Sequence, residues 1–331
     1  MTANRHTIAC FAALPALLLL AGFAMAHPGA ERFAQRVAEE QGLEAAFVLQ
    51  VLERAEYQQA VIDAITRPAE SKPWFEYRRI FIRDSRIDAG VQFWRDNRAL
   101  IERVADEFGV APEIILAIVG VETNYGTITG SYRVLDALVT LGFYYPKRGE
   151  FFARELAELF RLSREEDLPL DRVRGSYAGA MGVGQFIPSS YRAYAVDFDG
   201  SGSRDLWRSL PDALASVANY LAVHGWDTDR PVVLPVRAVP DGLDVDFPVQ
   251  PAHTLADLAD MGVAFDDAGL PAETSATLIE LDGEDGPEHW VGLKNFYVIT
   301  RYNRSPLYAM AVAQLAERIG HQGRAEPAAG E

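Results

Sequence analysis

The spacing of apolar and charged residues predicts a mainly helical chain. In the first third of the sequence, apolar side chains recur at mixed helical spacing with charges between them, over 34–52 and again over 87–108. Pro68 and Pro73 mark a break between these two stretches. We therefore expect a helical domain over 27–110.

An apolar run, Ile-Ile-Leu-Ala-Ile-Val, predicts a helix with an acid near its end. Pro112 suits the first helical turn, and Gly126 lies just past the last one. Ile115, Val119 and Glu122 share one helical face, so an ionisable group lies on an apolar stripe. Burial raises the pKa of a carboxyl group, as an acid that protonates a leaving oxygen near neutral pH requires. The alternative is a surface glutamate on the last turn of an ordinary core helix.

The pattern changes in the last third of the chain, where short β-type runs replace the helical spacing. They surround one short helical segment, over 254–261. We therefore expect a small mixed α/β insertion over 231–294. Its strands are predicted at 232–236, 244–249 and 277–281.

Helical spacing continues on both sides of this insertion. The segment 111–230 predicts a helical core that carries two glycine-rich stretches. Helix resumes after the insertion, so that about 295–320 is expected to join the first helical domain. The polar tail 321–331, which bears Ala, Gly and Pro, is expected to be mobile.

Composition and charge narrow the class of protein. The 331 residues are 49% apolar and carry a formal net charge of −16, which fits an acidic, soluble chain with more than one domain. A nucleic-acid binder usually carries a basic patch, so nucleic acid is not an expected partner.

The N-terminus resembles a secretory signal peptide over 1–26. Arg5 precedes a long apolar stretch, and Ala24-Met25-Ala26 fits a small-x-small cleavage site. The expected location is therefore the periplasm, with a membrane anchor as the alternative. Cleavage would also remove Cys10, the only cysteine, so no disulfide is expected in the mature chain.

A second informative stretch is rich in glycine, Gly175-Ser-Tyr-Ala-Gly-Ala-Met-Gly-Val-Gly-Gln185. Closely spaced glycines let the backbone approach a ligand or another chain segment. The amide of Gln185 offers two donors and an acceptor to sugar hydroxyl or acetamido groups. The stretch lacks a Gly-Lys-Ser/Thr ending and dinucleotide-type spacing, which disfavours a phosphate loop. The alternative is a tight helix–helix crossing.

A third stretch, 197–212, begins like an EF-hand calcium loop. Oxygen-bearing side chains stand at its first, third and fifth positions, and glycine at its sixth. The twelfth position holds Arg208 instead of the usual bidentate glutamate, so Asp212 is the candidate that closes a lengthened loop. The alternative is a turn without an ion. The candidate ligands are Asp197, Asp199, Ser201, Ser203 through its carbonyl group, and Asp212.

A fourth stretch, 295–308, places aromatic rings beside amide groups. Carbohydrates present apolar ring faces and hydroxyl edges together, so this mixture suits a sugar. The alternative is an aromatic core strand that enters a helix. Isolated histidines disfavour zinc-dependent hydrolysis, and the sequence has no Gly-x-Ser-x-Gly elbow.

Three of these stretches together resemble the membrane-bound lytic murein transglycosylase B family. The resemblance is specific, because several separate motifs occur in order across most of 70–318. It implies a lysozyme-like helical core over 111–230, flanked by the helical domain and the mixed insertion. It also implies cleavage of the β-1,4 bond from N-acetylmuramic acid to N-acetylglucosamine in peptidoglycan, with a 1,6-anhydromuramic end. The motifs are Gly120-Val-Glu-Thr-Asn-Tyr-Gly126, Gly175-Ser-Tyr-Ala-Gly-Ala-Met-Gly-Val-Gly-Gln-Phe-Ile-Pro-Ser189 and Phe296-Tyr-Val-Ile-Thr-Arg-Tyr-Asn303.

The resemblance also implies roles for single residues. Glu122 is expected to be the single catalytic acid/base, and Ser176 and Gln185 to touch the acetamido region of muramic acid. Lys147 and Arg148 are expected near its lactyl or peptide side. Family members carry a calcium loop as well, so one structural Ca²⁺ is the only ion expected, and the chemistry should need no cofactor. The residues expected to line the sugar groove are Tyr77, Tyr220, Tyr302, Asn303 and Tyr308.

No motif ties a second acid to Glu122, which fits a route in which the acetamido oxygen of the substrate supports the cationic centre. Two alternatives stay open, a hydrolytic lysozyme-type glycosidase and a non-catalytic peptidoglycan-binding scaffold. In each case the expected partner is the peptidoglycan glycan strand, with cell-wall synthesis proteins as further candidates. The chain is expected to act as a monomer.

Overall fold

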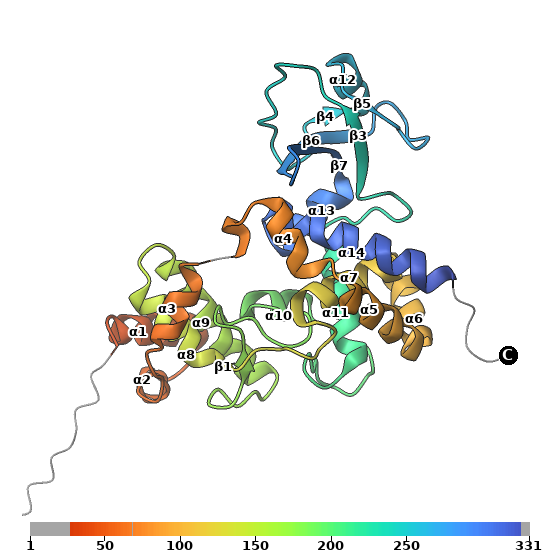
Figure 1. Cartoon of the computed structure of the whole chain (residues 1–331). Helices are drawn as coiled ribbons and strands as arrows, with labels where there is room; N and C mark the ends of the chain where they lie inside the picture. The colour runs from red at the N-terminus through yellow and green to blue at the C-terminus, as the bar shows by residue number, and fades with distance from the viewer. Residues whose placement is uncertain (1–26, 68, 326–331) are drawn as a thin grey trace, which may run out of the picture.

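The computed structural model describes residues 27–67 and 69–325, and these fold mainly as helices, as predicted (Figure 1). The expected signal peptide lies outside the described residues. Among the helices that are described, none is long and apolar enough to cross a membrane.

One group of helices combines two distant parts of the sequence and runs from the left of Figure 1 to α10 near its middle. The first and third helices of the chain pack against a later antiparallel pair, and α10 packs against the second helix of that pair. Backbone N–H groups of Glu56 and Gln58 donate to the buried side chains of Asp136 and Thr140, at 2.9 and 3.0 Å. The members are α1 (Ala30–Gln41), α2 (Ala45–Leu52), α3 (Gln59–Ile65), α8 (Val134–Tyr144), α9 (Gly149–Glu165) and α10 (Pro188–Tyr194).

A second group surrounds a central helix, α7. The C-terminal helix α14 packs on α7, α5 and α4, while α11 packs on α6, α7 and α13. The helices of 27–110 thus divide between the two groups, and the domain limits proposed from the sequence remain a prediction. The members are α4 (Trp74–Phe81), α5 (Asp84–Asp96), α6 (Arg98–Phe108), α7 (Pro112–Thr123), α11 (Leu210–Val223), α13 (Lys294–Tyr302) and α14 (Pro306–Ala325).

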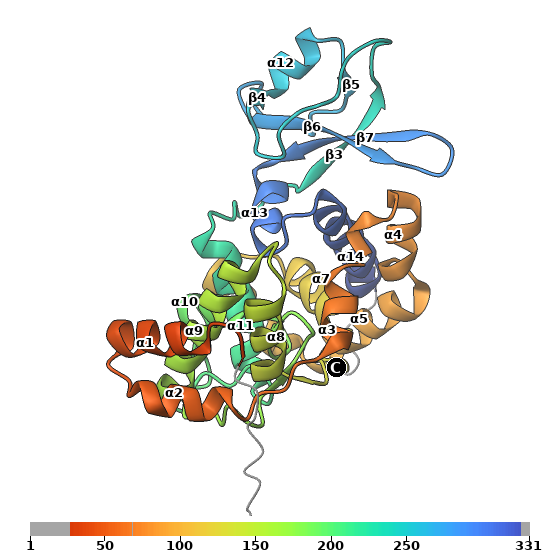
Figure 2. The ribbon, with the colours of Figure 1, turned by 90° about the vertical axis from the view of Figure 1, so that its left-hand side faces the viewer.

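The sheet of the insertion lies above α4 and α13, and its strands β6 and β7 contact these two helices (Figure 2). Its five strands follow the order β4-β6-β7-β3-β5, and β6 and β7 form an antiparallel hairpin with Ile279 opposite Trp290. A separate apolar cluster in the insertion includes Leu258 of α12 and Val291 of β7, both fully buried. The elements are β3 (Val233–Ala238), β4 (His253–Thr254), α12 (Leu255–Asp260), β5 (Ala264–Phe265), β6 (Ser275–Asp282) and β7 (Pro287–Leu293).

The strand predictions for this insertion are partly wrong. The runs at 232–236 and 277–281 coincide with β3 and β6, but residues 244–249 form no strand. Pro248 has no N–H group to contribute to a ladder, which limits the pairing of that run. The sequence analysis also missed β7, whose limits carry Pro287 and whose interior carries Gly292, residues that are more typical of turns than of strands.

The expected mobile tail is also partly wrong, because α14 continues to Ala325. Gly323 is buried in this last turn, and a side chain there would collide with the ring of Trp94. The guanidinium group of Arg324 is paired with Glu113 at the start of α7. The end of the helix is therefore held by packing and charge. Residues 326–331 lie outside the described part of the chain.

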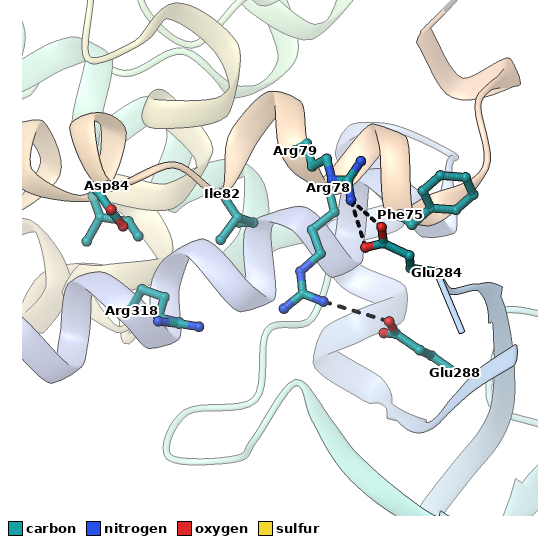
Figure 3. A pocket seen from close by; sticks show the side chains of 9 residues that line it. Phe75, Arg78, Arg79, Ile82, Asp84, Glu284, Glu288 and Arg318 are labelled. Atoms are coloured by element: carbon teal, nitrogen blue, oxygen red, sulfur yellow. Dashed lines mark hydrogen bonds and ion pairs between the residues drawn. The ribbon is translucent and has the colours of Figure 1, made fainter. Parts of the chain in front are cut away.

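Polar contacts connect the insertion to α4 beside a cavity of about 310 Å³ (Figure 3). Arg79 donates to both carboxylate oxygens of Glu284 at 2.7 Å, and Arg78 pairs with Glu288 at 3.7 Å. The indole N–H of Trp74 also donates to Glu288, at 3.1 Å. These contacts fix the β6–β7 hairpin against the helix that carries Tyr77.

Candidate active site

Glu122 lies on the last turn of α7, and the chain reverses directly after it. Asn124, Tyr125 and Gly126 all have positive φ, at 49°, 58° and 83°. The hydroxyl of Thr123 donates to the carbonyl of Val183 at 2.9 Å, which ties the end of the helix to the glycine-rich loop. The acid is therefore held where two segments of the motif-bearing core meet.

The other residues of the Gly120–Gly126 motif have structural tasks. A side chain on Gly120 would come within 2.8 Å of the Tyr125 ring, so glycine is needed there. Arg86 donates to the carbonyl of Gly120 at 2.8 Å, and the Tyr125 hydroxyl donates to the carbonyl of Arg86 at 2.9 Å. These contacts fix the turn, and none of them uses the carboxyl of Glu122.

The surroundings of Glu122 favour its protonated form. Burial raises the pKa of Glu122 from its ordinary value of 4.5 to about 7; the hydrogen bond from Tyr308 lowers the pKa and the charge of Glu70 raises it. That bond runs from the Tyr308 hydroxyl to Oε1 at 2.6 Å. Part of the Glu122 surface stays exposed, so a substrate can reach it. At neutral pH the group can therefore both give and take a proton.

Two stacked tyrosines adjoin this carboxyl. The rings of Tyr302 and Tyr308 are parallel within 5°, with centroids 6.5 Å apart, and the Tyr302 hydroxyl donates to the carbonyl of Gly184 at 2.5 Å. Burial, and next the charge of Glu122, raises the pKa of both phenols well above its usual range. Both therefore act as fixed hydroxyl donors.

The other tyrosines expected in the groove also lie in this cluster, but mostly below the surface. The ring of Tyr220 meets that of Tyr302 edge-on at 4.8 Å, and burial raises the pKa of Tyr77, with smaller contributions from Glu70 and Glu122. Only 1% of Tyr77, 8% of Tyr220 and 2% of Tyr308 is exposed, so they offer little ring surface for sugar stacking. They form a wall behind the acid, and Tyr302 is the part-exposed ring.

In the glycine-rich loop, only the amide oxygen of the Gln185 side chain is free to bind a ligand. The Gln185 amide nitrogen donates to the carbonyls of Thr129 and Gly182, at 3.1 and 2.9 Å, which uses both of its hydrogens. Its oxygen accepts no hydrogen bond from the residues that the structure describes. Gln185 also has a φ of 52°, a conformation that non-glycine residues rarely adopt. The side chain is thus pre-set as an acceptor.

Ser176, near the start of the same loop, offers a hydrogen-bond donor where Gln185 offers an acceptor. Its hydroxyl oxygen accepts from the N–H groups of Ala178 and Ala180, at 3.3 and 3.1 Å. Within the described chain that hydroxyl donates to no acceptor, so its hydrogen is available to a ligand. The short ladder between β1 (Tyr132–Arg133) and β2 (Arg174–Gly175) holds the start of the loop.

The two basic residues expected near the lactyl or peptide side of muramic acid lie outside the cluster of side chains around Glu122. Lys147 and Arg148 are exposed in the turn between α8 and α9, and the Arg148 guanidinium lies 4.3 Å from the centre of the Phe151 ring. No contact among the described residues joins either of them to Glu122. Their role therefore remains a prediction.

Three carboxylates of the 197–212 segment converge. Oxygens of Asp197, Asp199 and Asp212 lie within 4.8 Å of one another, and Asp212 is fully buried. Asp212 accepts from the backbone N–H groups of Phe198 and Asp205, at 2.8 and 3.0 Å. All-oxygen donors of this type suit calcium, and Asp212 stands where a lengthened loop would close. Arg208, at the twelfth position of the loop, is exposed, whereas Asp212 is buried beside the other two carboxylates.

Glu70 contacts a predicted site residue, a contact that the sequence analysis did not foresee. It lies in a one-turn segment, η1 (Ala69–Ser71), between α3 and α4. The amide of Asn303 donates to its Oε1 at 3.3 Å. An acid between two prolines in a linker carries no sequence signal for a site, and only the fold brings it to Asn303.

Comparisons with known proteins identify the family to which the chain is similar. Residues 26–317 match the transglycosylase SLT domain family. The chain is 39% identical over 304 residues to the membrane-bound lytic murein transglycosylase B of Escherichia coli K12, covering 88% of this chain and 83% of that protein.

Two solved structures are also similar. Catenated lytic transglycosylase SltB1 from Pseudomonas aeruginosa matches with a TM-score of 0.83 and 46% identity, over 89% of this chain and 98% of the other. The Escherichia coli lytic transglycosylase Slt35, solved in complex with bulgecin A and in complex with calcium, matches with a TM-score of 0.81 and 37% identity, over 90% and 94%.

Proposed function

The chain belongs to the transglycosylase SLT domain family and is a peptidoglycan-cleaving lytic transglycosylase with a lysozyme-like fold, and from this premise we propose that Glu122 is its single acid/base. The bond cleaved would be the β-1,4 bond from N-acetylmuramic acid to N-acetylglucosamine. The observation that carries the proposal is the part-buried carboxyl of Glu122, held by the Tyr308 hydroxyl at 2.6 Å.

In the first step Glu122 transfers its proton to the glycosidic oxygen. The bond from muramic C1 to that oxygen breaks, and its electron pair stays with the departing acetylglucosamine. The carbonyl oxygen of the muramic acetamido group then bonds to C1 and takes up the positive charge. A pKa of about 7 supports this step, because a large share of Glu122 carries its proton at neutral pH.

In the second step the Glu122 carboxylate accepts a proton. The C6 hydroxyl of the same muramic acid attacks C1, the bond from C1 to the acetamido oxygen breaks, and the hydroxyl proton moves to Glu122. The ring closes as 1,6-anhydromuramic acid, and the acid is restored. Attack within one sugar gains effective molarity and needs no positioned water molecule.

The glycine-rich loop would hold the acetamido group in place for this chemistry. The free oxygen of Gln185 can accept from the acetamido N–H, and the hydroxyl of Ser176 can donate to an oxygen of the same sugar. Tyr302 would line the adjoining wall, where its bond to Gly184 holds the ring in place. These contacts supply orientation, while the substrate supplies the nucleophile.

The converging aspartates would hold one structural calcium ion. Asp197, Asp199 and Asp212 would supply carboxylate oxygens, with Ser201 and the carbonyl of Ser203 as further ligands. Slt35, solved in complex with calcium, supports this assignment. The ion would neutralise the cluster and brace the loop that precedes α11, and the cleavage chemistry would need no cofactor.

The partner we propose is the peptidoglycan glycan strand, and the proposed location is the periplasm. The signal-like pattern at 1–26 and the peptidoglycan-cleaving activity support that location. We retain cell-wall synthesis proteins as candidate partners and a monomer as the proposed state.

Cleavage of purified wall sacculi tests the proposal. Mass spectrometry of the soluble fragments should find anhydromuramic ends with the unchanged chain, whereas reducing muramic ends would indicate hydrolysis. Glu122→Gln should keep binding to sacculi and release no fragments. Near-wild-type turnover by the purified Glu122→Gln variant would exclude the proposed acid/base role.

A further inference from the structure

A cavity of about 490 Å³ lies where the insertion meets the helices α7 and α14. Its wall includes Ile114 from the first turn of α7, Gln314 from α14, Trp226 from the connection after α11 and Trp290 from β7. Along the axis of α7, Ile114 is about 12 Å from Glu122, and no residue of the candidate active site lines this cavity. The cavity is therefore separate from that site, and it has the size of a small-molecule pocket.

Two side chains of this wall carry a buried polar atom that has no hydrogen-bond partner among the residues that the structure describes. These atoms are Nε1 of Trp290, a donor, and Oε1 of Gln314, an acceptor. Gln314 is only 8% exposed, and a buried polar atom that stays unpaired costs free energy, so native structures satisfy the great majority of such groups. One free donor and one free acceptor in the same wall suit a ligand that both accepts and donates hydrogen bonds.

The remaining wall favours a neutral ligand with flat apolar faces. The indole rings of Trp226 and Trp290 are both half-buried, and rings of this kind pack against the apolar faces of a sugar. Arg230 and Glu317 also line the cavity, and they are exposed and opposite in charge, while Glu113 is held in an ion pair with α14. No excess of charge therefore favours a phosphate or an amine, and the wall suits a saccharide.

We propose that this cavity is a second saccharide-binding site, which holds an N-acetylated sugar of the glycan strand away from the bond that is cleaved. The acetamido carbonyl would accept from the indole N–H of Trp290, and the acetamido N–H would donate to the amide oxygen of Gln314. Both protein atoms are covered in this structure, so binding requires a side-chain rotation. The last torsion of a glutamine is broad, so the Gln314 amide can turn without moving α14. The inference goes beyond the proposed function, because it needs no role for Glu122.

Calorimetric titration of the whole chain with tri-N-acetylchitotriose tests this site. The parent protein carries Glu122→Gln, so that the sugar is not consumed, and it should show one binding event in the active-site groove and another in the cavity. Adding Gln314→Leu or Trp290→Phe should weaken one of the two events by about tenfold and leave the other unchanged. Gln314→Leu replaces an unpaired buried amide with an apolar group of similar size, so its melting temperature should not fall. The matched control is Trp94→Phe, which removes another buried, unpaired indole N–H from a residue outside this cavity, and it should keep both events.

Cleavage of sacculi provides a second measurement, with Glu122 intact. Gln314→Leu should raise the KM for sacculi and keep kcat, because the cavity holds the strand and does not touch the reacting atoms.

Two results would overturn the proposal. One is a titration in which Gln314→Leu and Trp290→Phe both bind the sugar as the parent does. The other is a site that takes acetyl-trialanine amide in place of the sugar and loses it in the same two variants, which would assign the cavity to a peptide. Turnover by Glu122→Gln would instead overturn the proposed function, so the two failures are distinguishable.

Discussion

The hydrogen bond from Tyr308 to Glu122 allows a direct test of how the acid is tuned. Tyr308→Phe keeps the ring and removes only the hydroxyl that donates to Oε1 at 2.6 Å. A hydrogen bond to a charged group contributes about 1.5–3 kcal/mol, and about 1.36 kcal/mol corresponds to one pKa unit. The pKa of Glu122, about 7 in the wild type, should therefore rise by roughly 1 to 2 units.

This rise has two kinetic consequences. The first step needs the protonated acid, so the alkaline limb of kcat/KM against pH should move upwards by the same amount. A carboxyl that holds its proton more tightly is also a weaker donor, so the maximal rate should fall. The assay is release of anhydromuropeptides from purified sacculi over a pH series, with fragments separated by chromatography and identified by mass spectrometry.

Tyr302→Phe is the control for this experiment. It removes a neighbouring hydroxyl that donates to the carbonyl of Gly184 and not to the acid. Its rate is expected to fall, but its alkaline limb should stay where the wild type has it. If the limb of Tyr308→Phe does not move, or moves downwards, the reasoning about the hydrogen bond is refuted.

Two further predictions concern stability. Because burial raises the pKa of Glu122, its contribution to stability is complete below its ordinary value of 4.5 and is lost as the pH rises through about 7, by at most about 3 kcal/mol. Denaturant unfolding should therefore find Glu122→Gln more stable than the wild type above neutral pH, and an equal stability there would contradict the raised pKa. Calcium at a hundredfold excess over its dissociation constant should stabilise the fold by about 2.7 kcal/mol, seen as a higher melting temperature that a chelator reverses. Asp212→Asn should lose this gain while the control Asp246→Asn keeps it, and equal gains in both would exclude the aspartate site.

The local patterns of the catalytic core were predictable because they depend on neighbours in the sequence. Pro112 and the apolar run specify α7, and the spacing of Glu122 along one face predicted an acid in apolar surroundings. The structure agrees, since burial is the largest cause of the raised pKa of Glu122. The oxygen-rich start of the 197–212 segment likewise predicted a cluster of acids there, and Asp212, the candidate to close a lengthened loop, lies in it.

Other features depend on contacts between distant segments and could not be predicted. Glu70 and Asn303 are 233 residues apart, and no periodicity links them. The expectation that Gln185 offers two donors failed for a similar reason, because Thr129 and Gly182 occupy both amide hydrogens. In the insertion, β7 is stabilised by pairing with β6 and β3, which outweighs the weak strand preference of its own residues.

The acid and its phenolic partner are 186 positions apart, so a chain that emerges N-terminus first exposes one long before the other. Until α14 docks against α7, that carboxyl lacks both the hydroxyl that donates to it and the burial that this helix supplies. A half-made or truncated product therefore has no competent proton donor. Assembly of this pair is therefore tied to completion of the fold at the C-terminal helix.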